Sequence, residues 1–166
     1  MEWSQIQTGH MRYVPEYFDV KFLVEEAIEL LGCNAEEKSI FIQNNIADGT
    51  IVYADKTMVS IVLRNLISNA LKYTNLKGLV QISSKKQEHE LIISINDNGV
   101  GIAKELMDKL FQIDGVISTP GTQKEKGTGL GLILCREYLG KNKGKIWVQS
   151  EVNEGTTFYF SLPLND

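Results

Sequence analysis

The chain has 166 residues, of which 43% are hydrophobic and 23% charged, and its formal net charge is −4. This composition is typical of one soluble globular domain, and the acidic balance argues against broad binding to nucleic-acid backbones, which requires clustered positive charge. The sequence contains no apolar run near the roughly 20 residues of a membrane span and no signal-peptide pattern.

The two cysteines, Cys33 and Cys135, both fall in apolar helical patterns. We therefore expect buried, reduced thiols, as in a cytosolic protein. No group of cysteines and histidines has the spacing of metal ligands, so a metal site of that kind is not expected.

In chain order, residues 1–19 show little periodicity and are expected to form a connecting arm. Asp19 is a candidate N-cap for an amphipathic helix over about residues 20–37. Residues 39–44 and 50–53 are short strand candidates around the Asp48-Gly49 turn. The apolar face of this first helix is expected to consist of Phe22, Leu23, Ala27, Ile28, Leu30 and Leu31.

Asp55 is expected to cap a second helix that ends near Tyr73. The remaining elements are expected in this order: two strands over about 79–86 and 90–96, a long polar segment, a helix over about 129–142, and two strands over 145–150 and 156–162. We expect an α+β two-layer sandwich, in which three helices cover one face of a mixed, mostly antiparallel sheet of about five strands. The buried stripe of the second helix is expected to be Val59, Val62, Leu63, Leu66 and Ala70.

Asp97 is the first candidate functional residue. It ends a strand-like run and is followed by two glycines, Gly99 and Gly101. An ionised carboxylate is the strongest side-chain acceptor for an amino group such as that of adenine, and glycines allow the backbone to approach a flat ring. The alternative is a hairpin turn, because Asn98-Gly99 is also a two-residue turn signal.

A second glycine cluster, Gly127-Thr128-Gly129-Leu130-Gly131-Leu132, directly precedes the last predicted helix. Free backbone N–H groups at the positive end of a helix favour an anion. The spacing fits neither the dinucleotide-binding fingerprint nor the P-loop. A plain glycine-rich turn is the alternative.

Asn65, Asn69 and Lys72 follow one another at positions i, i+4 and i+7 of the second helix, beside its buried stripe. An amide oxygen can bind a magnesium ion whose other ligands are phosphates and waters, and a lysine can neutralise phosphate charge. The alternative is a solvated helix face.

These motifs, in this order and spacing, resemble the boxes of histidine-kinase ATP-binding domains over roughly residues 17–165. Residues 65–73 resemble the N box, 97–101 the G1 box, 110–111 the F box, 127–132 the G2 box and 155–158 the last box. The resemblance implies the Bergerat ATP-binding fold, shared with the gyrase, Hsp90 and MutL ATPases, and implies ATP and Mg²⁺ as cofactors.

The resemblance also implies roles. Asp97 would hold adenine, with Thr157 supporting the same edge through water, and Asn69 would ligate magnesium with Asn65 close by. Lys72 and Tyr73 would contact phosphate and ribose or base. Residues 103–128 would form a flexible ATP lid, anchored by Phe111, from which Lys124 and Lys126 could meet the phosphates. The ATP-binding residues expected in this way are Asn65, Asn69, Lys72, Tyr73, Asp97, Gly99, Gly101, Ile102, Phe111, Lys126, Gly127, Thr128, Gly129, Leu130, Gly131, Leu132 and Thr157.

Asn65 bears on the type of reaction. The ATPases of this fold are expected to carry a glutamate at that position to activate water, and an amide cannot take up the proton. We therefore expect transfer of the γ-phosphate to a histidine rather than hydrolysis. The alternatives are an ATPase of the same fold, a serine kinase of the anti-sigma type, or a non-catalytic module whose lid is ordered by nucleotide.

We expect the acceptor histidine to lie on a separate dimerisation domain. His10 precedes Pro15 at the spacing of an acceptor box but lacks the acidic residue that should follow it, and His89 falls in a turn. Residues 1–16 are expected to be the tail of that domain and its linker, and residues 17–166 the catalytic domain. A response regulator would be a further partner, with no nucleic acid or membrane contact. The isolated chain is expected to be monomeric, inactive in autophosphorylation and cytoplasmic.

Overall fold

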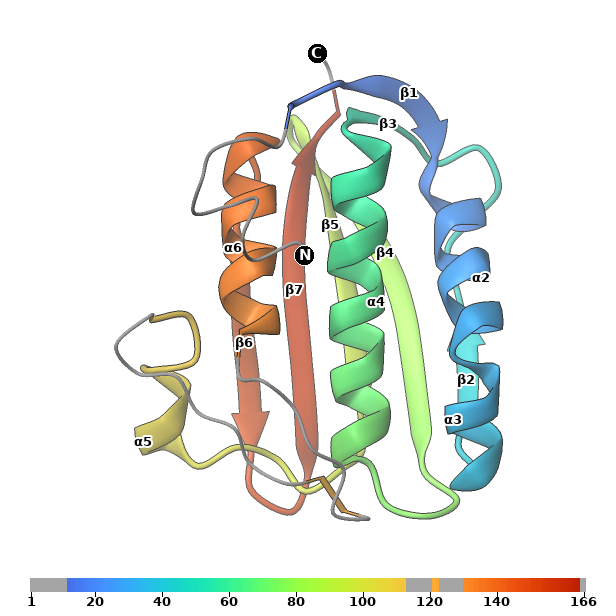
Figure 1. Ribbon diagram of the computed structural model, residues 1–166, viewed down its shortest axis with the longest axis vertical. Coiled ribbons are helices and arrows are strands. Elements are labelled where there is room, and N and C mark those ends of the chain that lie inside the picture. The colour runs from blue at the N-terminus through green and yellow to red at the C-terminus, as the bar shows by residue number, and fades with distance from the viewer. Residues whose placement is uncertain (1–11, 113–120, 123–129, 165–166) are drawn as a thin grey trace.

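The computed structural model describes residues 12–112, 121–122 and 130–164 (Figure 1). The first half of the chain forms β1 (Glu16–Asp19), α2 (Val20–Leu30), α3 (Gly32–Glu37), β2 (Phe41–Asn44), β3 (Ile51–Ala54) and α4 (Lys56–Tyr73). The second half forms β4 (Leu79–Gln87), β5 (Glu90–Asp97), α5 (Lys104–Met107), α6 (Gly131–Lys141), β6 (Ile146–Glu151) and β7 (Gly155–Pro163).

The described strands form a five-stranded sheet in the order β2-β4-β5-β7-β6 and a two-stranded sheet of β1 and β3. β2 is parallel to β4, and the other neighbours in the large sheet are antiparallel. The expected mixed, mostly antiparallel sheet is therefore confirmed.

Helices α2, α4 and α6 lie side by side on one face of the large sheet (Figure 1), which confirms the two-layer sandwich. α4 is the central helix of this layer, and all five residues of its expected stripe are buried. They belong to one continuous core with alternate residues of β4, β5 and β7, including Ile82, Ile93 and Phe160. None of the described helices combines the length and the apolar character needed to cross a bilayer.

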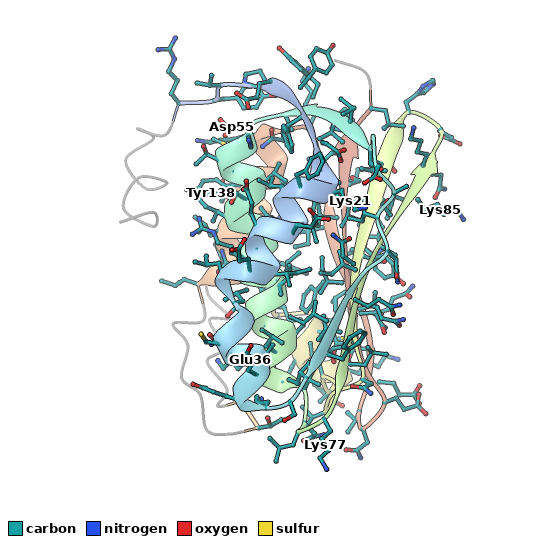
Figure 2. All side chains as sticks on the ribbon, turned by 90° about the vertical axis from the view of Figure 1, so that its right-hand side faces the viewer. Lys21, Glu36, Asp55, Lys77, Lys85 and Tyr138 are labelled. Carbon is teal, nitrogen blue, oxygen red and sulfur yellow. The ribbon has the colours of Figure 1, made fainter. Side chains whose placement is uncertain are left out.

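The N-terminus of α4 is fixed by Asp55. Its Oδ1 accepts a hydrogen bond of 3.0 Å from the Met58 N–H, as an N-cap does, and its Oδ2 accepts one of 2.8 Å from Val14 N–H. The Asp55 N–H donates to Oδ1 of Asn142, which follows α6. Figure 2 shows Asp55 near one end of the molecule and Lys77, in the turn after α4, at the other. The C-terminal half of α4 therefore extends to the end of the molecule opposite Asp55, where the candidate site lies.

Two expectations for the first 54 residues are wrong. Residues 16–19 form β1, which pairs with β3, so the strand continues the fold where an arm was expected. The first helix is broken at Leu31 into α2 and α3. The two strand candidates around the Asp48-Gly49 turn are present as β2 and β3, of which β2 pairs with β4 and β3 with β1.

The expected apolar face of the first helix is also wrong in part, because Phe22 and Leu30 are 58% and 62% exposed. Leu23 and Ala27 are buried as expected, together with Val20 and Val24, and Ile28 and Leu31 pack against the core. Of the two cysteines, Cys135 is buried as expected but Cys33, in α3, is exposed.

Candidate functional site

Asp97 ends the central strand β5 and points into the layer between sheet and helices, where it is 5% exposed. Burial disfavours the charged form and raises the pKa of its carboxyl group to about 6. Two backbone N–H groups act against this effect by donating to Oδ1, that of Gly99 at 2.9 Å and that of Thr156 at 3.3 Å. No N–H or O–H group of the described residues donates to Oδ2, so this oxygen is available to a donor on a ligand.

The two glycines after Asp97 sit where a side chain has no room. A Cβ on Gly99 would lie 2.2 Å from the carbonyl oxygen of Tyr73 at the end of α4. A Cβ on Gly101, whose φ is +75°, would lie 2.1 Å from the carbonyl oxygen of Glu151. The loop therefore runs in contact with α4 on one side and with the β6–β7 turn on the other.

Backbone hydrogen bonds hold this loop in place. The Val100 N–H donates to Tyr73 O at 3.0 Å, and Val100 O accepts from the Asn153 N–H at 2.7 Å. The Ile102 N–H donates to Ser150 Oγ at 2.8 Å, and the Ile102 side chain packs on the core. The chain after Asp97 leads into α5 rather than back along the sheet, so the hairpin alternative for Asn98-Gly99 is wrong.

The expectation that Thr157 supports the edge of Asp97 is wrong by one position. In the β5–β7 pair Asp97 lies opposite Thr156, whereas Thr157 lies opposite Asn96. Successive strand residues point to opposite faces, and the Thr157 hydroxyl accepts a hydrogen bond of 2.6 Å from Asn96 Nδ2 on the face away from Asp97. Thr156 is buried beside Asp97, and its hydroxyl lies 2.8 Å from Ser150 Oγ.

The polar strip of α4 faces the start of α6. A Cβ on Gly131, the first residue of α6, would lie 2.9 Å from Oδ1 of Asn65, so the two helices meet closely at this point. Asn65 Nδ2 donates to Ile61 O at 3.0 Å. Asn69 lies one turn further along α4, half-buried, and its side chain has no hydrogen-bond partner among the described residues. Its amide oxygen is thus available to a ligand or metal ion.

The N-terminus of α6 adds a positive helix end to the same region (Figure 1). Its N-cap is Leu130, whose side chain cannot cap the first-turn N–H groups. Leu132 packs against the core and orients this turn. Of the expected G2 residues, Gly127, Thr128 and Gly129 lie outside the described residues, as do Lys124 and Lys126.

Lys72 and Tyr73 are half-buried at the C-terminal end of α4, and the Lys72 ammonium lies 5.1 Å from the centre of the Tyr73 ring. A short segment of the expected lid contacts this end: the Thr122 N–H donates to Lys72 O and the Thr122 hydroxyl to Thr74 O, both at 3.0 Å. Sequence reasoning missed Thr122, because its partners are main-chain atoms.

Phe111 packs edge-on against Phe158 of β7, with ring centres 6.5 Å apart, and contacts the core. Its carbonyl oxygen accepts a hydrogen bond of 3.1 Å from Arg136 of α6, a residue that carried no signal in the sequence. Phe111 therefore ties the segment after α5 to the same end of the sheet as Asp97.

The described residues fit a nucleotide with its magnesium ion. They offer a buried carboxylate for an amino donor, a neutral amide oxygen for a metal ion, a lysine and a helix N-terminus for phosphate, and a backbone without Cβ atoms for a flat ring. These groups come from β5, α4, α6 and the loop after β5. The C-terminal end of α4 and the loop after β5 lie at the lower end of the molecule, and the N-terminus of α6 lies above them, beside the middle of α4 (Figure 1).

Residues 54–166 match the family model described as histidine kinase-, DNA gyrase B- and HSP90-like ATPase. The adaptive-response sensory kinase SasA of Gloeothece citriformis is 35% identical over 162 residues, which are 96% of this chain and 39% of that protein. The chain thus spans well under half of this relative.

Among solved structures, the catalytic domain of the histidine kinase ThkA superposes with a TM-score of 0.77 at 30% identity, covering 93% of this chain and 97% of that one. ThkA in complex with the response regulator TrrA gives a TM-score of 0.79 at 24% identity, covering 99% of this chain and 46% of that one. The second likeness shows the shared fold alone.

Proposed function

The chain belongs to the histidine kinase-, DNA gyrase B- and HSP90-like ATPase family, on the branch of the histidine kinase catalytic domains, and we propose that it binds Mg-ATP and transfers the γ-phosphate to a histidine of a dimerisation domain. The observation that carries this proposal is Asp97, a buried carboxylate with one oxygen held by backbone N–H groups and the other available. Adenine presents an amino donor suited to that oxygen.

The nucleotide would lie with its adenine at Asp97 and its triphosphate along the C-terminal half of α4, toward the N-terminus of α6. Lys72 and the first-turn N–H groups of α6 would bind phosphate oxygens, and Asn69 would ligate the magnesium ion. When bound, that ion would neutralise charge on the phosphates. The nucleoside would be bordered by Tyr73, Gly99, Gly101 and Ile102. Asp97 would be supported by Thr156, whose N–H donates to Oδ1, in place of Thr157.

Phosphotransfer is favoured over hydrolysis by Asn65. Its amide cannot take up a proton from water. Oδ1 of this side chain lies close to Gly131 of α6, and Nδ2 donates a hydrogen bond to Ile61 O of α4, so the side chain is held between the two helices. Catalysis by this domain would consist of positioning the γ-phosphate and balancing its charge.

The partners follow from the same proposal. They are the dimerisation domain that carries the acceptor histidine and a response regulator that receives the phosphate afterwards. We propose a cytoplasmic location and a catalytic domain over residues 17–166. Pairing of β1 with β3 from Glu16 onward supports a domain boundary close to that position.

Replacing Asn69 with alanine should remove the magnesium-dependent part of ATP binding. In the wild type, ATP affinity should be higher in millimolar magnesium, on the order of tenfold above that in EDTA, and in Asn69→Ala the two values should converge. The measurement is a calorimetric titration of ATP in each buffer. Ser68→Ala, at the neighbouring half-buried position of α4, is the matched control and should keep the wild-type ratio. An Asn69→Ala variant that loses affinity equally with and without magnesium would remove Asn69 from the metal site.

A further inference from the structure

Lys38 is a buried lysine, 5% exposed, at the C-cap of α3. Its ammonium group donates to the carbonyl oxygen of Leu71 at 2.8 Å and to that of Lys72 at 3.0 Å. Lysines are seldom buried unless they are paired. The partner here is the C-terminal end of α4, where carbonyl groups lack helical donors and the helix dipole is negative.

The same turn of α4 holds two parts of the candidate nucleotide site. Lys72 O accepts from the Thr122 N–H as well as from Lys38, Tyr73 O accepts from the Val100 N–H, and Thr74 O accepts from the Thr122 hydroxyl. Val100 lies in the glycine loop after Asp97, and Thr122 lies in the expected lid. Three consecutive carbonyl groups therefore attach the loop and the lid segment to the helix end that Lys38 secures.

Lys38 also ties down the turn that leaves α4, since its carbonyl oxygen accepts a hydrogen bond of 2.8 Å from the Lys77 N–H. Figure 2 shows Lys77 and Glu36 of α3 at the same lower end of the molecule, opposite Asp55. The end of α4 is thus held from the side of α3 and β4, while the glycine loop and Thr122 attach to it.

We propose that Lys38 is a positioning residue for the nucleotide site. It fixes the last turn of α4, and through the carbonyls of Lys72, Tyr73 and Thr74 it fixes where the glycine loop and the Thr122 segment lie relative to a bound nucleotide. Lys38 acts on the site through the main chain of α4 and does not need to contact the nucleotide. This inference rests on the proposed function for its effect on ATP affinity, but its effect on the loop and lid can be measured without nucleotide.

The test is Lys38→Met in the 166-residue chain, which keeps much of the side-chain length and removes the three N–H donors. ATP affinity should fall roughly 2- to 30-fold, the range expected for a residue coupled to a site it does not touch. In the nucleotide-free protein, amide hydrogen exchange should accelerate at Val100 and Thr122, while the amides of residues 60–64 in the first half of α4 should exchange at the wild-type rate.

Two control variants separate positioning from general effects. Lys77→Met removes the same charge from an exposed residue beyond the end of α4 and should leave both ATP affinity and exchange unchanged. Leu91→Val loosens the core at the start of β5, far from Asp97, and should lower the melting temperature with unchanged ATP affinity. Should Lys38→Met fail to fold, Lys38→Gln, whose shorter side chain keeps an N–H donor, should show smaller changes in the same direction in both measurements.

The inference is overturned if Lys38→Met only lowers the melting temperature while ATP affinity and exchange at Val100 and Thr122 match the wild type. A wild-type chain that binds no ATP would instead overturn the proposed function, and the exchange measurement would still decide the role of Lys38. Faster exchange at Val100 and Thr122 in Lys38→Met, together with weaker ATP binding, supports both the role of Lys38 and the proposed function.

Discussion

Replacing Asp97 with alanine should weaken ATP binding by about 10- to 150-fold, which corresponds to a hydrogen bond to a charged group worth about 1.5–3 kcal/mol. The variant removes Oδ2, the oxygen available to the adenine amino group, and also leaves the Gly99 and Thr156 N–H groups without their acceptor. The measurement is a calorimetric titration of Mg-ATP at pH 7.5. Asn96→Ala is the matched control, because Asn96 precedes Asp97 on β5 but points to the opposite face, and its affinity should stay at the wild-type value.

The pH dependence of the same titration gives a second comparison. Because burial raises the pKa of Asp97 to about 6, the carboxylate is the main form above that pH and the neutral acid below it. Only the carboxylate is an anionic acceptor, so wild-type affinity should fall as the pH drops through about 6 and approach that of Asp97→Ala. The nucleotide phosphates titrate equally in both proteins, so the difference between them isolates Asp97. If the wild type and Asp97→Ala had equal ATP affinities at pH 7.5, or pH profiles that ran parallel, Asp97 would be ruled out as the adenine acceptor.

Replacing Gly99 with alanine should lower the free energy of unfolding by about 1–3 kcal/mol, as for overpacking of a filled site. The added Cβ would lie 2.2 Å from Tyr73 O and 2.9 Å from Asp97 Oδ1. Tyr73 O cannot withdraw easily, since it belongs to the end of α4 and also accepts from the Val100 N–H. We expect weaker ATP binding as well, because relief of the clash must move the loop beside Asp97.

Gly140→Ala is the matched control for that variant. Gly140 lies in α6, and a Cβ added there would meet no atom within 4 Å, so alanine should raise the free energy of unfolding by roughly 0.5–1 kcal/mol through its helix propensity. Urea denaturation of both variants checks the pair. If Gly99→Ala were as stable as the wild type with full ATP affinity, the close contact between the loop and α4 would not exist in solution.

The sequence was sufficient for the elements in which local signals and burial agree. α4 has an Asp55 cap, an uninterrupted apolar stripe and a polar strip beside it, and it was predicted nearly to its ends. The strands β4, β5 and β7 alternate between buried and less buried residues, and these three strands and β6 were likewise predicted. The break at Leu31 was missed because the apolar spacing continues across it, although Gly32 lowers helix propensity there.

Pairing between distant segments was harder to predict. β1 has four residues, Glu16–Asp19, and exists as a strand because β3 lies beside it. β2 likewise pairs in parallel with β4, a choice made by tertiary packing rather than by the nearby Asp48-Gly49 turn.

For the candidate site, the sequence identified side chains with distinctive chemistry, such as Asp97 and Asn69, but not the main-chain atoms that hold them. The N–H groups of Gly99 and Thr156 and the carbonyl groups of α4 depend on strand register and close approach. The register could have been found by aligning Gly155-Thr156 with the end of β5, which would have assigned Thr156 instead of Thr157.

The most direct test is a calorimetric titration of Mg-ATP into the wild-type chain, followed by chromatographic analysis of the nucleotide in the cell. We expect saturable one-site binding, a heat signal that returns to baseline, and ATP recovered intact, because Asn65 cannot activate water. Sustained heat with accumulation of ADP, absent from an Asp97→Ala control, would identify an ATPase and contradict the proposed phosphotransfer. No binding at any magnesium concentration would contradict the nucleotide site itself.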